Sequence, residues 1–590
     1  MIIKKFQEIL KQKNIDAYIV PTSDYHNSEY ISDFFKSRAF LSNFTGSAGT
    51  LLITQNEAFL WTDGRYYIQA AKELNNSITL MKQGLPDVPN IIDFLKTKLS
   101  NEQTLGFDGK VISATFGNKI KNELPNIKIK DEDLIPLIWL NRPKLPFSML
   151  YRLDAFFTGK TFEAKIKDIQ TIMKDKNCDT HIISSLEDQA WLYNLRANDI
   201  SHTPVFLSYT IVLDNQCYLF IDQTKIDKTI EKYLKDNNVI INSYTDFYSF
   251  IKLIKNQKIL LDFNKINYTI YNSLKENNQL VNSLDPSLLL KAIKNETEIA
   301  NIKKAHIKDG VAMVKFLHYV KTKVKQEQDL TEISVTKVLE NLRKEQPGFV
   351  DISFNTICAY NEHAAMMHYS ANENTNSTLR PEGFLLVDSG GHYLEGSTDI
   401  TRTICLGKPT NEMKLHYTTV LKSVIALSEA VFLKGVRGIN LDILARGPIW
   451  KLLIDYKCGT GHGIGYLLSV HEAPNGFRWQ VVPERNDSAI LQEGMITTNE
   501  PGIYLENKYG IRIENELLCI NKGKSEFGEF LGFETITYAP IDLEAIDAKL
   551  LNNEERIWID SYHKNVYDTL SPYLNEEEKF WLKENTKPIK

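Results

Sequence analysis

The spacing of hydrophobic and polar positions predicts where the chain is helical. At the start, hydrophobic residues recur at helical offsets among charged residues, at Ile2, Phe6, Ile9 and Leu10. This pattern predicts an amphipathic surface helix. From about residue 290, after the helix-start sequence NETE, a longer pattern repeats at three- and four-residue offsets, at Ile293, Ile299, Ile302, Ala305 and Ala312. Helices then alternate with strands of alternating polarity up to about residue 537.

The first half of the chain contains a diverged internal repeat. The segment at 14–20, NIDAYIV, resembles the segment at 177–183, NCDTHII. The segment at 50–63, TLLITQNEAFLWTD, resembles the one at 210–222, TIVLDNQCYLFID. Between them lies a stretch that begins FLSNFTGS in one copy and WLYNLRAN in the other. Each copy offers a buried strand, then two strands joined by a polar turn, which predicts two related α/β domains.

These patterns divide the chain into three predicted domains. A chain of 590 residues exceeds the length that one hydrophobic core usually serves, about 250–300 residues. The proline-bearing stretch WLNRPKLPFS at 139–148 predicts the first boundary, and the change to long helices predicts the second. We therefore expect domains at 1–145, 146–289 and 290–590, in a mixed α/β (α+β) protein.

Composition and charge narrow the classes of function. Hydrophobic residues make up 43% and charged residues 24% of the chain, as in ordinary soluble globular proteins. The net charge is -5, and no basic stripe interleaved with aromatic residues is present, so we expect no nucleic-acid partner. The amphipathic start is unlike a signal peptide, and no apolar run is long enough to span a membrane. The six cysteines are scattered without a C-x-x-C pair, which indicates a reducing, cytoplasmic compartment.

Two aspartates stand out in the stretch LLVDSGGHYLEGSTDITRT at 385–403. If its arms pair as an antiparallel hairpin centred between Tyr393 and Leu394, Asp388 lies directly across from Asp399. Like charges opposite each other on a half-buried sheet are destabilising. Taken alone, both aspartates fit an ordinary role as turn residues, because DSGG and STD are good turn sequences.

Further candidates of the same chemistry follow along the chain. His462 lies among the glycines of GTGHGIG, and Glu500 ends a predicted strand in TTNEPG. In YGIRIENELL, strict alternation places Arg512, Glu514 and Glu516 on one strand face. Charges in such apolar strands cannot be buried singly without a proton or a cation. A pair of divalent metal ions would explain the cluster, and carboxylates with one imidazole suit Mn²⁺, Co²⁺ or Zn²⁺.

These motifs resemble those of a known family. VDSGGHYLEGSTDITRT, GTGHGIG, VHEAP, TTNEPG and GIRIENELL are similar to the metal-site motifs of the pita-bread metallopeptidases, in the same order. With WTDGRYYIQAA near the start and LGFETITYAPID after the last motif, nearly the whole chain resembles the three-domain aminopeptidase P (Xaa-Pro aminopeptidase) family. The resemblance implies two creatinase-like N-terminal domains followed by a pita-bread catalytic domain.

The resemblance also implies a site with two divalent ions, most often Mn²⁺, per subunit. Its ligands would be Asp388, Asp399, His462, Glu500 and Glu514. Asp399 and Glu514 would bridge both ions, and Glu500 would act as general base on the attacking water. His368 and His471 would position substrate and stabilise the reaction intermediate. Such enzymes remove the first residue of peptides with proline in second position.

Three further expectations follow from the resemblance. Arg512 would donate to the ligand carboxylates, and Arg65 would face the active site across a domain junction. The subunits would pair as a homodimer through the catalytic domain. One position departs from the family, since CGTGHG carries Cys458 where the three-domain enzymes commonly have histidine. We expect this change to affect affinity for the residue after the scissile bond, and to give Cys458 an oxidation sensitivity.

Two alternatives stand beside the aminopeptidase. A prolidase would split only Xaa-Pro dipeptides, although the long duplicated first half argues against it. A non-enzymatic pita-bread module would bind peptides or partner proteins, but such relatives usually lack several of the ligands. Metal-free hydrolysis of the creatinase kind is disfavoured for the same reason.

Overall fold

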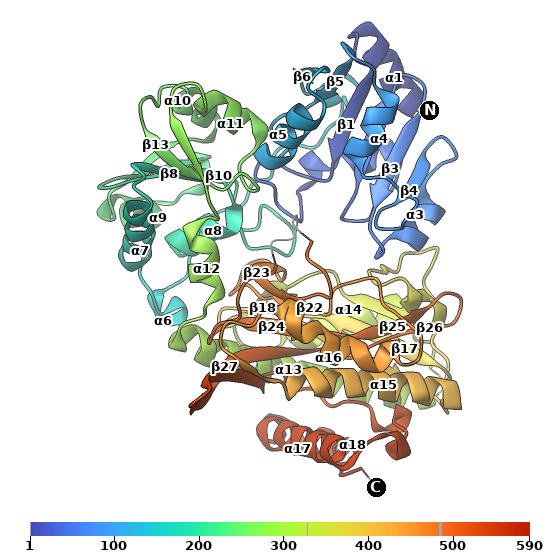
Figure 1. Ribbon diagram of the computed structural model, residues 1–590. Coiled ribbons are helices and arrows are strands. Elements are labelled where there is room, and N and C mark those ends of the chain that lie inside the picture. The colour runs from blue at the N-terminus through green and yellow to red at the C-terminus, as the bar shows by residue number, and fades with distance from the viewer. Residues whose placement is uncertain (1, 327, 483–486, 590) are drawn as a thin grey trace. The chain divides into compact units, whose positions relative to one another are not determined.

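The computed structural model describes residues 2–326, 328–482 and 487–589. The chain forms two compact units (Figure 1). The first unit comprises residues 1–155 and 160–288, and the second unit comprises residues 156–159 and 289–590. The predicted boundary stretch at 139–148 contains no helix or strand.

The first half of the first unit is a six-stranded sheet with helices, of order β4-β3-β2-β1-β5-β6. Its strands are β1 Ala17–Pro21, β2 Thr50–Thr54, β3 Ala58–Thr62, β4 Thr79–Lys82, β5 Thr104–Phe107 and β6 Lys128–Asp131. Its helices are α1 Ile2–Gln12, α2 Ser37–Ser42, α3 Tyr67–Glu73, α4 Ile91–Lys98 and α5 Ala114–Glu123. The predicted amphipathic first helix is confirmed, because Phe6 and Leu10 of α1 are fully buried.

The second half of the first unit has a sheet of order β12-β11-β10-β8-β13-β14. Its strands are β8 Thr180–Ile183, β10 Ser208–Leu213, β11 Cys217–Ile221, β12 Val239–Ser243, β13 Lys258–Leu261 and β14 Gln279–Asn282, beside the short pair β7 Tyr151–Arg152 and β9 Leu195–Arg196. Its helices are α7 Phe162–Asp175, α8 Leu186–Tyr193, α9 Lys228–Asp236, α10 Phe247–Ile251 and α11 Tyr268–Leu274. The helices α6 Ala155–Thr158 and α12 Pro286–Ala292 lie where the chain passes between the units.

The two sheets have the same topology, as the internal repeat predicted. The pair β1 and β2 is antiparallel, as is β8 with β10, and the outer pairs β3·β4 and β11·β12 are both parallel. The helix after the first strand also ends alike in the two halves. Asn43 and Asn194 end α2 and α8 in the left-handed conformation, with φ of 62° and 52°. Asparagine tolerates this conformation, which explains why the repeat keeps it there.

The second unit combines helices with several antiparallel sheets. Its helices are α13 Glu296–Lys325, α14 Glu332–Lys344, α15 Asn411–Ser428, α16 Gly438–Trp450, α17 Asn553–Leu570 and α18 Glu576–Asn585. Helix α13 begins where the sequence predicted, because Asn295 and Glu298 cap it reciprocally. The C-terminal helices α17 and α18 pack on α13, as seen at the bottom of Figure 1.

Four sheets of the second unit carry the polar residues singled out above. Their orders are β15-β18-β19, β16-β17-β20, β21-β28-β27-β24-β22-β23 and β25-β26. The strands are β15 Phe349–Ile352, β16 Ile357–Tyr360, β17 Phe384–Ser389, β18 Gly391–Tyr393, β19 Gly396–Ser397, β20 Ile400–Cys405, β21 Val431–Leu433, β22 Gly461–Gly463, β23 Glu472–Phe477, β24 Ile496–Asn499, β25 Gly502–Leu505, β26 Tyr509–Arg512, β27 Asn515–Ser525 and β28 Gly528–Thr535.

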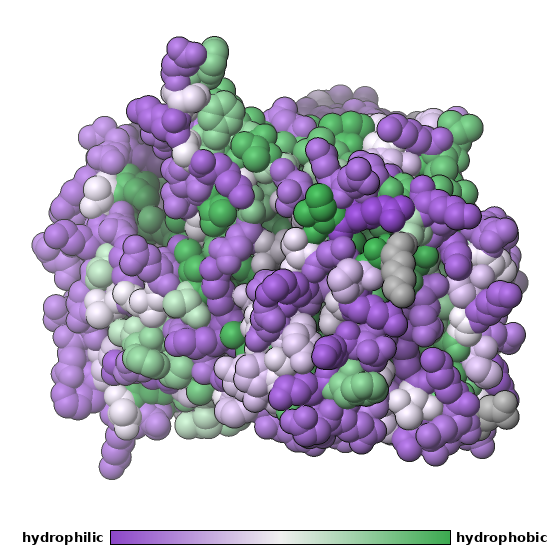
Figure 2. Space-filling view, turned by 90° about the horizontal axis from the view of Figure 1, so that it is seen from below, coloured by the Kyte–Doolittle hydropathy of each residue, from purple (hydrophilic) through white to green (hydrophobic). Residues whose placement is uncertain are grey.

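Two observations concern the distribution of hydrophobic residues. Among the described residues, we find no helix with the length and apolar character needed to cross a membrane. On the face drawn in Figure 2, hydrophilic residues predominate and hydrophobic residues lie in small groups between them.

Candidate metal centre

Asp388 and Asp399 lie on one face of the β17–β20 hairpin, but not directly opposite each other. Asp388 pairs with Thr401, and Tyr393 pairs with Gly396, so the turn is centred between Leu394 and Glu395, one residue later than predicted. Gly396, just after the turn, has a φ of 139°, a conformation that glycine adopts readily. The predicted register is therefore wrong. Because side chains alternate with a period of two, the two aspartates still share a face, as diagonal neighbours.

Three of the predicted ligands come close enough to hold one metal ion. One side-chain donor atom each from Asp399, His462 and Glu514 lies within 4.8 Å of the others. The His462 Nε2 atom is 3.6 Å from Asp399 Oδ2 and 3.5 Å from Glu500 Oε1. Asp388 joins the group through Arg512, whose Nη2 donates to Asp388 Oδ2 at 2.5 Å. The structure thus brings all five predicted ligands to one place in the second unit.

His462 is held by the strands on either side of it. Strand β22 lies between β23 and β24, and the backbones approach so closely that a Cβ on Gly461 would lie 1.8 Å from Thr498 O. This is why glycine flanks the histidine. The His462 main-chain N–H donates to Thr498 Oγ1 at 3.0 Å, and this hydroxyl lies 3.4 Å from Glu500 Oε1. Glu500 itself follows β24, with its N–H donated to Thr460 O at 2.8 Å.

Glu514 lies at a break between two strands. The sequence predicted one alternating strand through YGIRIENELL, but Arg512 ends β26, paired with β25, and β27 begins only at Asn515, paired with β24. The predicted single strand is therefore wrong. Glu514 donates its N–H to Thr401 O at 3.1 Å and accepts from Thr401 Oγ1 at 2.6 Å. The break turns the carboxylate toward the β17–β20 hairpin.

Burial and mutual repulsion favour the protonated form of these carboxyl groups in the absence of cations. Burial, followed by the charges of Glu514 and Asp388, raises the pKa of Asp399 well above its usual range. Burial and the charges of Glu500 and Asp388 do the same to the pKa of Glu514. For Glu500, burial outweighs the opposing charge of Arg512 and raises the pKa to about 7. Each of these shifts would be reversed by a cation at the centre of the cluster.

Two oxygens of the cluster give a further test of whether the residues fit a metal. Asp388 Oδ1 and Asp399 Oδ1 are buried and make no hydrogen bond with any residue in the described part of the chain. Buried polar atoms are nearly always paired, so such atoms call for an explanation. Four carboxylates and one imidazole form the hard, oxygen-rich donor set that suits Mn²⁺, Co²⁺ or Zn²⁺. The residues present fit divalent metal ions.

Arg512 is buried among the carboxylates and is not a surface ion pair. Only 3% of it is exposed, and it donates to Asp388, to Thr401 Oγ1 at 3.1 Å and to Tyr504 Oη at 2.6 Å. Its Nη2 also lies 3.5 Å from Met367 O, which places the segment of His368 beside this arginine. A single guanidinium cannot balance all the carboxylates that surround it.

His471 stands against the ring of His462. Their ring centroids are 4.3 Å apart with the planes at 82°, so His471 borders the cluster as the sequence predicted. The next residue, Glu472, is buried and is anchored by ion pairs to Lys294 and Lys291. These ion pairs hold the backbone immediately after His471.

Arg65 and Cys458 have less direct relations to the site. Arg65 belongs to the first unit, where it forms a two-point ion pair with Asp63 at 2.7 and 2.8 Å. Its role toward the active site stays a prediction. Burial, followed by the charge of Glu500, raises the pKa of the Cys458 thiol to about 12. Because the thiolate is the reactive form, this setting disfavours the predicted oxidation sensitivity.

Sequence analysis missed two threonines that organise the site. Thr401 links Glu514 to Arg512, and Thr498 links the backbone of His462 to Glu500. Each lies two residues from a predicted ligand, Thr401 after Asp399 and Thr498 before Glu500. The period of two along a strand places such residues on the same face, and this rule could have found them.

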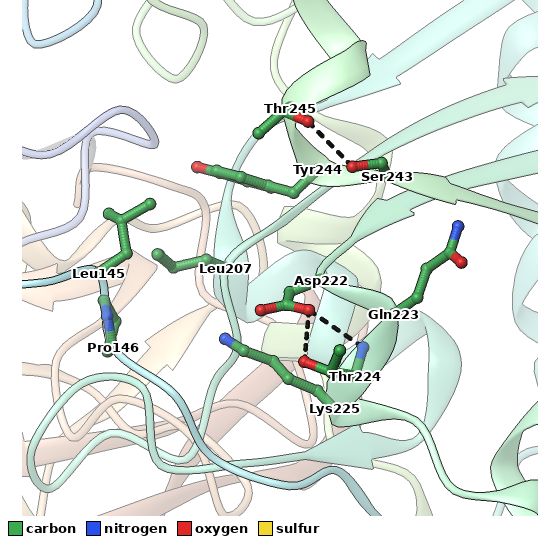
Figure 3. Close-up of a pocket in the computed structure, with 10 residues that line it drawn as sticks. All are labelled: Leu145, Pro146, Leu207, Asp222, Gln223, Thr224, Lys225, Ser243, Tyr244 and Thr245. Atoms are coloured by element: carbon green, nitrogen blue, oxygen red, sulfur yellow. Dashed lines mark hydrogen bonds between the residues drawn. The ribbon is translucent and has the colours of Figure 1, made fainter.

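A cavity in the first unit is separate from this cluster. It has a volume of about 330 Å³ and lies at the carboxyl ends of the parallel strands β11 and β12 (Figure 3). None of the predicted site residues lines it. Several of its polar side chains are already paired, with Asp222 accepting from Thr224, Ser243 beside Thr245, and Lys225 bound to Asp199. We therefore assign the chemistry to the carboxylate cluster of the second unit.

Family models match four consecutive parts of the chain. Residues 300–521 match metallopeptidase family M24, and residues 529–589 match the C-terminal region of peptidase M24. Residues 2–138 and 141–298 match two models of the creatinase/prolidase N-terminal domain. All five predicted ligands lie within the M24 match. The duplicated first half therefore corresponds to two creatinase-like domains.

Relatives that match the whole of this chain are named as Xaa-Pro aminopeptidases. The chain is 38% identical to "Xaa-Pro aminopeptidase 1" of Dictyostelium discoideum, over 100% of this chain and 96% of that protein. It is 35% identical to "Probable Xaa-Pro aminopeptidase P" of Laccaria bicolor, over 100% of this chain and 93% of that protein. A Bacillus anthracis Xaa-Pro dipeptidase, at 22% identity and a TM-score of 0.51 over 65% of this chain and 99% of its own, shares the fold alone.

The structural match extends to one solved enzyme over almost its whole chain. The crystal structure of X-prolyl aminopeptidase from Caenorhabditis elegans, described as a cytosolic enzyme with a di-nuclear active site, superposes with a TM-score of 0.93. It shares 34% identity and covers 98% of this chain and 95% of its own. This chain therefore belongs to the Xaa-Pro aminopeptidases of metallopeptidase family M24.

Proposed function

We propose that the protein hydrolyses the first peptide bond of peptides with proline in second position and releases one amino acid. One observation carries the proposal. In this member of the family, four carboxylates and a histidine converge in the second unit, at Asp388, Asp399, His462, Glu500 and Glu514. Such a cluster is stable only with cations or protons at its centre.

The cofactor of the proposal is a pair of divalent metal ions per subunit, with Mn²⁺ as the expected metal. Asp399 and Glu514 would bridge both ions, with Asp388 completing the ligands of one ion, and His462 and Glu500 completing those of the other. When bound, two such cations lower the pKa of a water molecule and stabilise negative charge on the substrate carbonyl oxygen. The unpaired oxygens of Asp388 and Asp399 support this assignment.

The chain's own residues would move the protons. Glu500 lies 3.5 Å from His462 Nε2 and at the edge of the cluster, where its side chain is 20% exposed and can meet a substrate. It would take the proton of the attacking water and pass it to the proline nitrogen as the peptide bond breaks. Since that nitrogen carries no hydrogen in the peptide, the proton is needed before proline can leave as an amine.

Two histidines and two arginines would complete the site. His471, against the His462 ring, and His368, one residue after Met367 beside Arg512, would hold the substrate and stabilise the intermediate. Arg512 would keep the Asp388 carboxylate aimed into the cluster. For Arg65 we propose a contact with substrate, on the strength of the family motif alone.

The proposal includes a homodimer in the cytoplasm. The second unit exposes several apolar side chains. Leu453 is 97% exposed and lies three residues after Trp450. The partly exposed rings of Trp450 and Trp479 have centroids 6.3 Å apart. Such exposed apolar residues are typical of contact surfaces. Light scattering should give twice the mass of the chain. Replacing Leu453 by Glu should then shift the protein toward the monomer, whereas a monomeric wild type would contradict the pairing.

A prolidase is the alternative within the same chemistry. Relatives named as aminopeptidases match the entire chain, whereas the dipeptidase structure covers 65% of it, which favours the aminopeptidase. The tripeptides and longer peptides that distinguish the two enzymes extend beyond the proline. The site must therefore leave room for the chain after that residue.

Cleavage of defined peptides tests the proposal. Protein stripped of metal and reloaded with Mn²⁺ should convert Arg-Pro-Pro-Gly into Arg and Pro-Pro-Gly, as followed by mass spectrometry. A matched peptide with alanine second should be cut far more slowly, and one with a blocked amino terminus hardly at all. Cleavage of Xaa-Pro dipeptides without cleavage of the tetrapeptide would identify a prolidase. Absence of metal and of Mn²⁺-dependent cleavage would favour a binding module.

A further inference from the structure

The backbone of Asp399 is held by a carboxylate from another strand. Strand β19 ends at Ser397 and β20 begins at Ile400, so Asp399 lies in the gap between two sheets. Its main-chain N–H donates to Glu516 Oε1 at 2.8 Å. Glu516 is fully buried, on β27. At this break, a side-chain carboxylate therefore replaces the strand partner that a regular ladder would supply.

Glu516 is in turn held from helix α13. Its Oε2 atom lies 3.0 Å from His306 Nε2, and both side chains are fully buried. The contact is close but is not aligned as a hydrogen bond, and His306 Nδ1 has no hydrogen-bond partner among the described residues. Helix α13 is thus connected to Asp399 through Glu516.

A second contact ties the same helix to the same hairpin. Asp309, about one turn after His306 on α13, receives two hydrogen bonds from Arg343 of α14, at 2.7 and 2.9 Å. The Tyr393 hydroxyl on β18 donates to the same carboxylate at 2.7 Å. The hairpin that carries Asp399 is therefore anchored to α13 at two points, directly by Tyr393 and through Glu516.

We infer that Glu516 and His306 are positioning residues for Asp399 and set the affinity of the metal site, an inference that rests on the proposed function for Asp399 as a bridging ligand. Glu516 fixes the Asp399 backbone, and His306 fixes Glu516. A bridging carboxylate must aim both oxygens at once, so a small rotation weakens its contact with two ions. Replacing a group that orients a metal ligand typically weakens metal affinity by about 10–100-fold.

Metal titration of stripped protein tests this inference without reference to any substrate. The variants are Glu516→Ala, Glu516→Gln and His306→Ala, and Mn²⁺ affinity is measured by calorimetry. Glu516→Ala should weaken binding by about 10–100-fold, because the Asp399 N–H loses its acceptor. Glu516→Gln keeps an oxygen acceptor and should recover part of the loss. His306→Ala leaves Glu516 without its outer contact and should lie between wild type and Glu516→Ala.

A matched control is available in the first unit. His181 is also fully buried, with its Nε2 atom 3.3 Å from the carboxylate of Asp285. His181→Gln should lower the melting temperature but leave Mn²⁺ affinity unchanged. If Glu516→Ala behaves in the same way, lowering the melting temperature with unaltered affinity, the inference is overturned. If Glu516→Ala does not fold, unchanged affinity in His306→Ala has the same consequence.

Asp399→Asn separates this inference from the proposed function. If Asp399→Asn loses metal while both Glu516→Ala and His306→Ala bind it as wild type does, the positioning role alone fails. If Asp399→Asn keeps its full metal content, Asp399 is no ligand, and the assignment of the bridging site fails with it.

Discussion

The two units bury histidine–carboxylate pairs with opposite consequences. In the first unit, burial disfavours the charge on Asp285, yet the His181 ring and the hydrogen bonds from Ser287 together outweigh burial and lower the Asp285 pKa. In the second unit, His462 faces Asp399 at 3.6 Å, but burial, followed by the charges of Glu514 and Asp388, raises the pKa of that aspartate well above its usual range. Both aspartates are at most 4% exposed.

The two pairs differ in the number of carboxylates that share one histidine. Asp285 has its own histidine, and Ser287 donates its N–H to the same carboxylate at 3.0 Å, so the charge is balanced locally. Asp399 shares His462 with Glu500, and the charges of Glu514, Asp388 and Glu500 all act on it. A pair of this first kind stabilises a fold, whereas a cluster of the second kind costs stability until a cation arrives. The comparison places the functional site where buried carboxylates lack enough positively charged partners in the protein itself.

The largest effect is expected at Glu500. Glu500→Gln removes the proton acceptor and weakens a ligand, while the amide keeps the size of the side chain. We expect kcat on a proline-second peptide to fall by about 10²–10⁴-fold. The melting temperature of the metal-free protein should not fall, since one repelling charge is lost. A variant with a kcat within tenfold of wild type, at full metal occupancy, would remove Glu500 from the mechanism.

Neutralising one aspartate in each unit should change stability in opposite directions. Asp285→Asn leaves His181 without its ion pair and should cost about 1–3 kcal/mol. Asp399→Asn, measured without metal at pH 9, should cost nothing or raise the melting temperature, because it removes a carboxyl group that its neighbours repel. Calorimetric melting of both variants against wild type makes the comparison. Equal destabilisation by the two substitutions would contradict the proposed difference between a locally paired aspartate and one in a carboxylate cluster.

The pH dependence of stability should also distinguish the units. Glu500 has its pKa raised from 4.5 to about 7, so the folded metal-free protein holds more protons than the unfolded chain between these values. Its stability should therefore fall as pH rises through this window. The lowered pKa of Asp285 acts in the reverse sense, and its contribution is lost as pH falls below 3.8. Melting temperatures from pH 4.5 to 8 should decline with a chelator and decline less with Mn²⁺. Identical profiles would refute the link to metal.

The smallest effect is expected from restoring the family histidine at Cys458. Cys458 lies near Glu500 and Arg512, whose charges act on its thiol. An imidazole there would add a donor to the pocket for the residue after the scissile bond. Cys458→His should lower KM a few-fold, by roughly 0.5–1.5 kcal/mol for one hydrogen bond, and leave kcat nearly unchanged. Steady-state kinetics on one tripeptide checks this, with Cys458→Ser as the control. A change in kcat alone would place the residue elsewhere.

Local chemistry made much of this molecule predictable. The repeat was visible because both copies keep buried strands, and asparagines 43 and 194 occupy the same left-handed position. The start of α13 was visible because Asn295 and Glu298 form a cap within four residues. The cluster was visible because acidic residues interrupt apolar strands and glycines flank His462, whereas the choice of five ligands rested on the family resemblance.

Other features depend on contacts that no local pattern records. The hairpin register was missed because the Leu394–Glu395 turn lacks the asparagine–glycine sequence that usually marks a two-residue turn. The break before Glu514 was missed because hydrophobic alternation continues across it while the partner strand changes. The contact between His306 and Glu516 joins a helix to a strand far away in sequence, so only the fold can reveal it.

Proton release on metal binding tests the central claim most directly. If the carboxylates gather to hold cations, burial and mutual repulsion raise the pKa values of Asp399 and Glu514 in the metal-free protein, and bound cations must lower them again. Calorimetric titration with Mn²⁺ in two buffers of different ionisation enthalpy measures both stoichiometry and released protons. The account predicts two ions bound per chain and a net release of protons. Binding of one ion or none, without proton release, would contradict it, because the cluster would then be balanced by the protein itself.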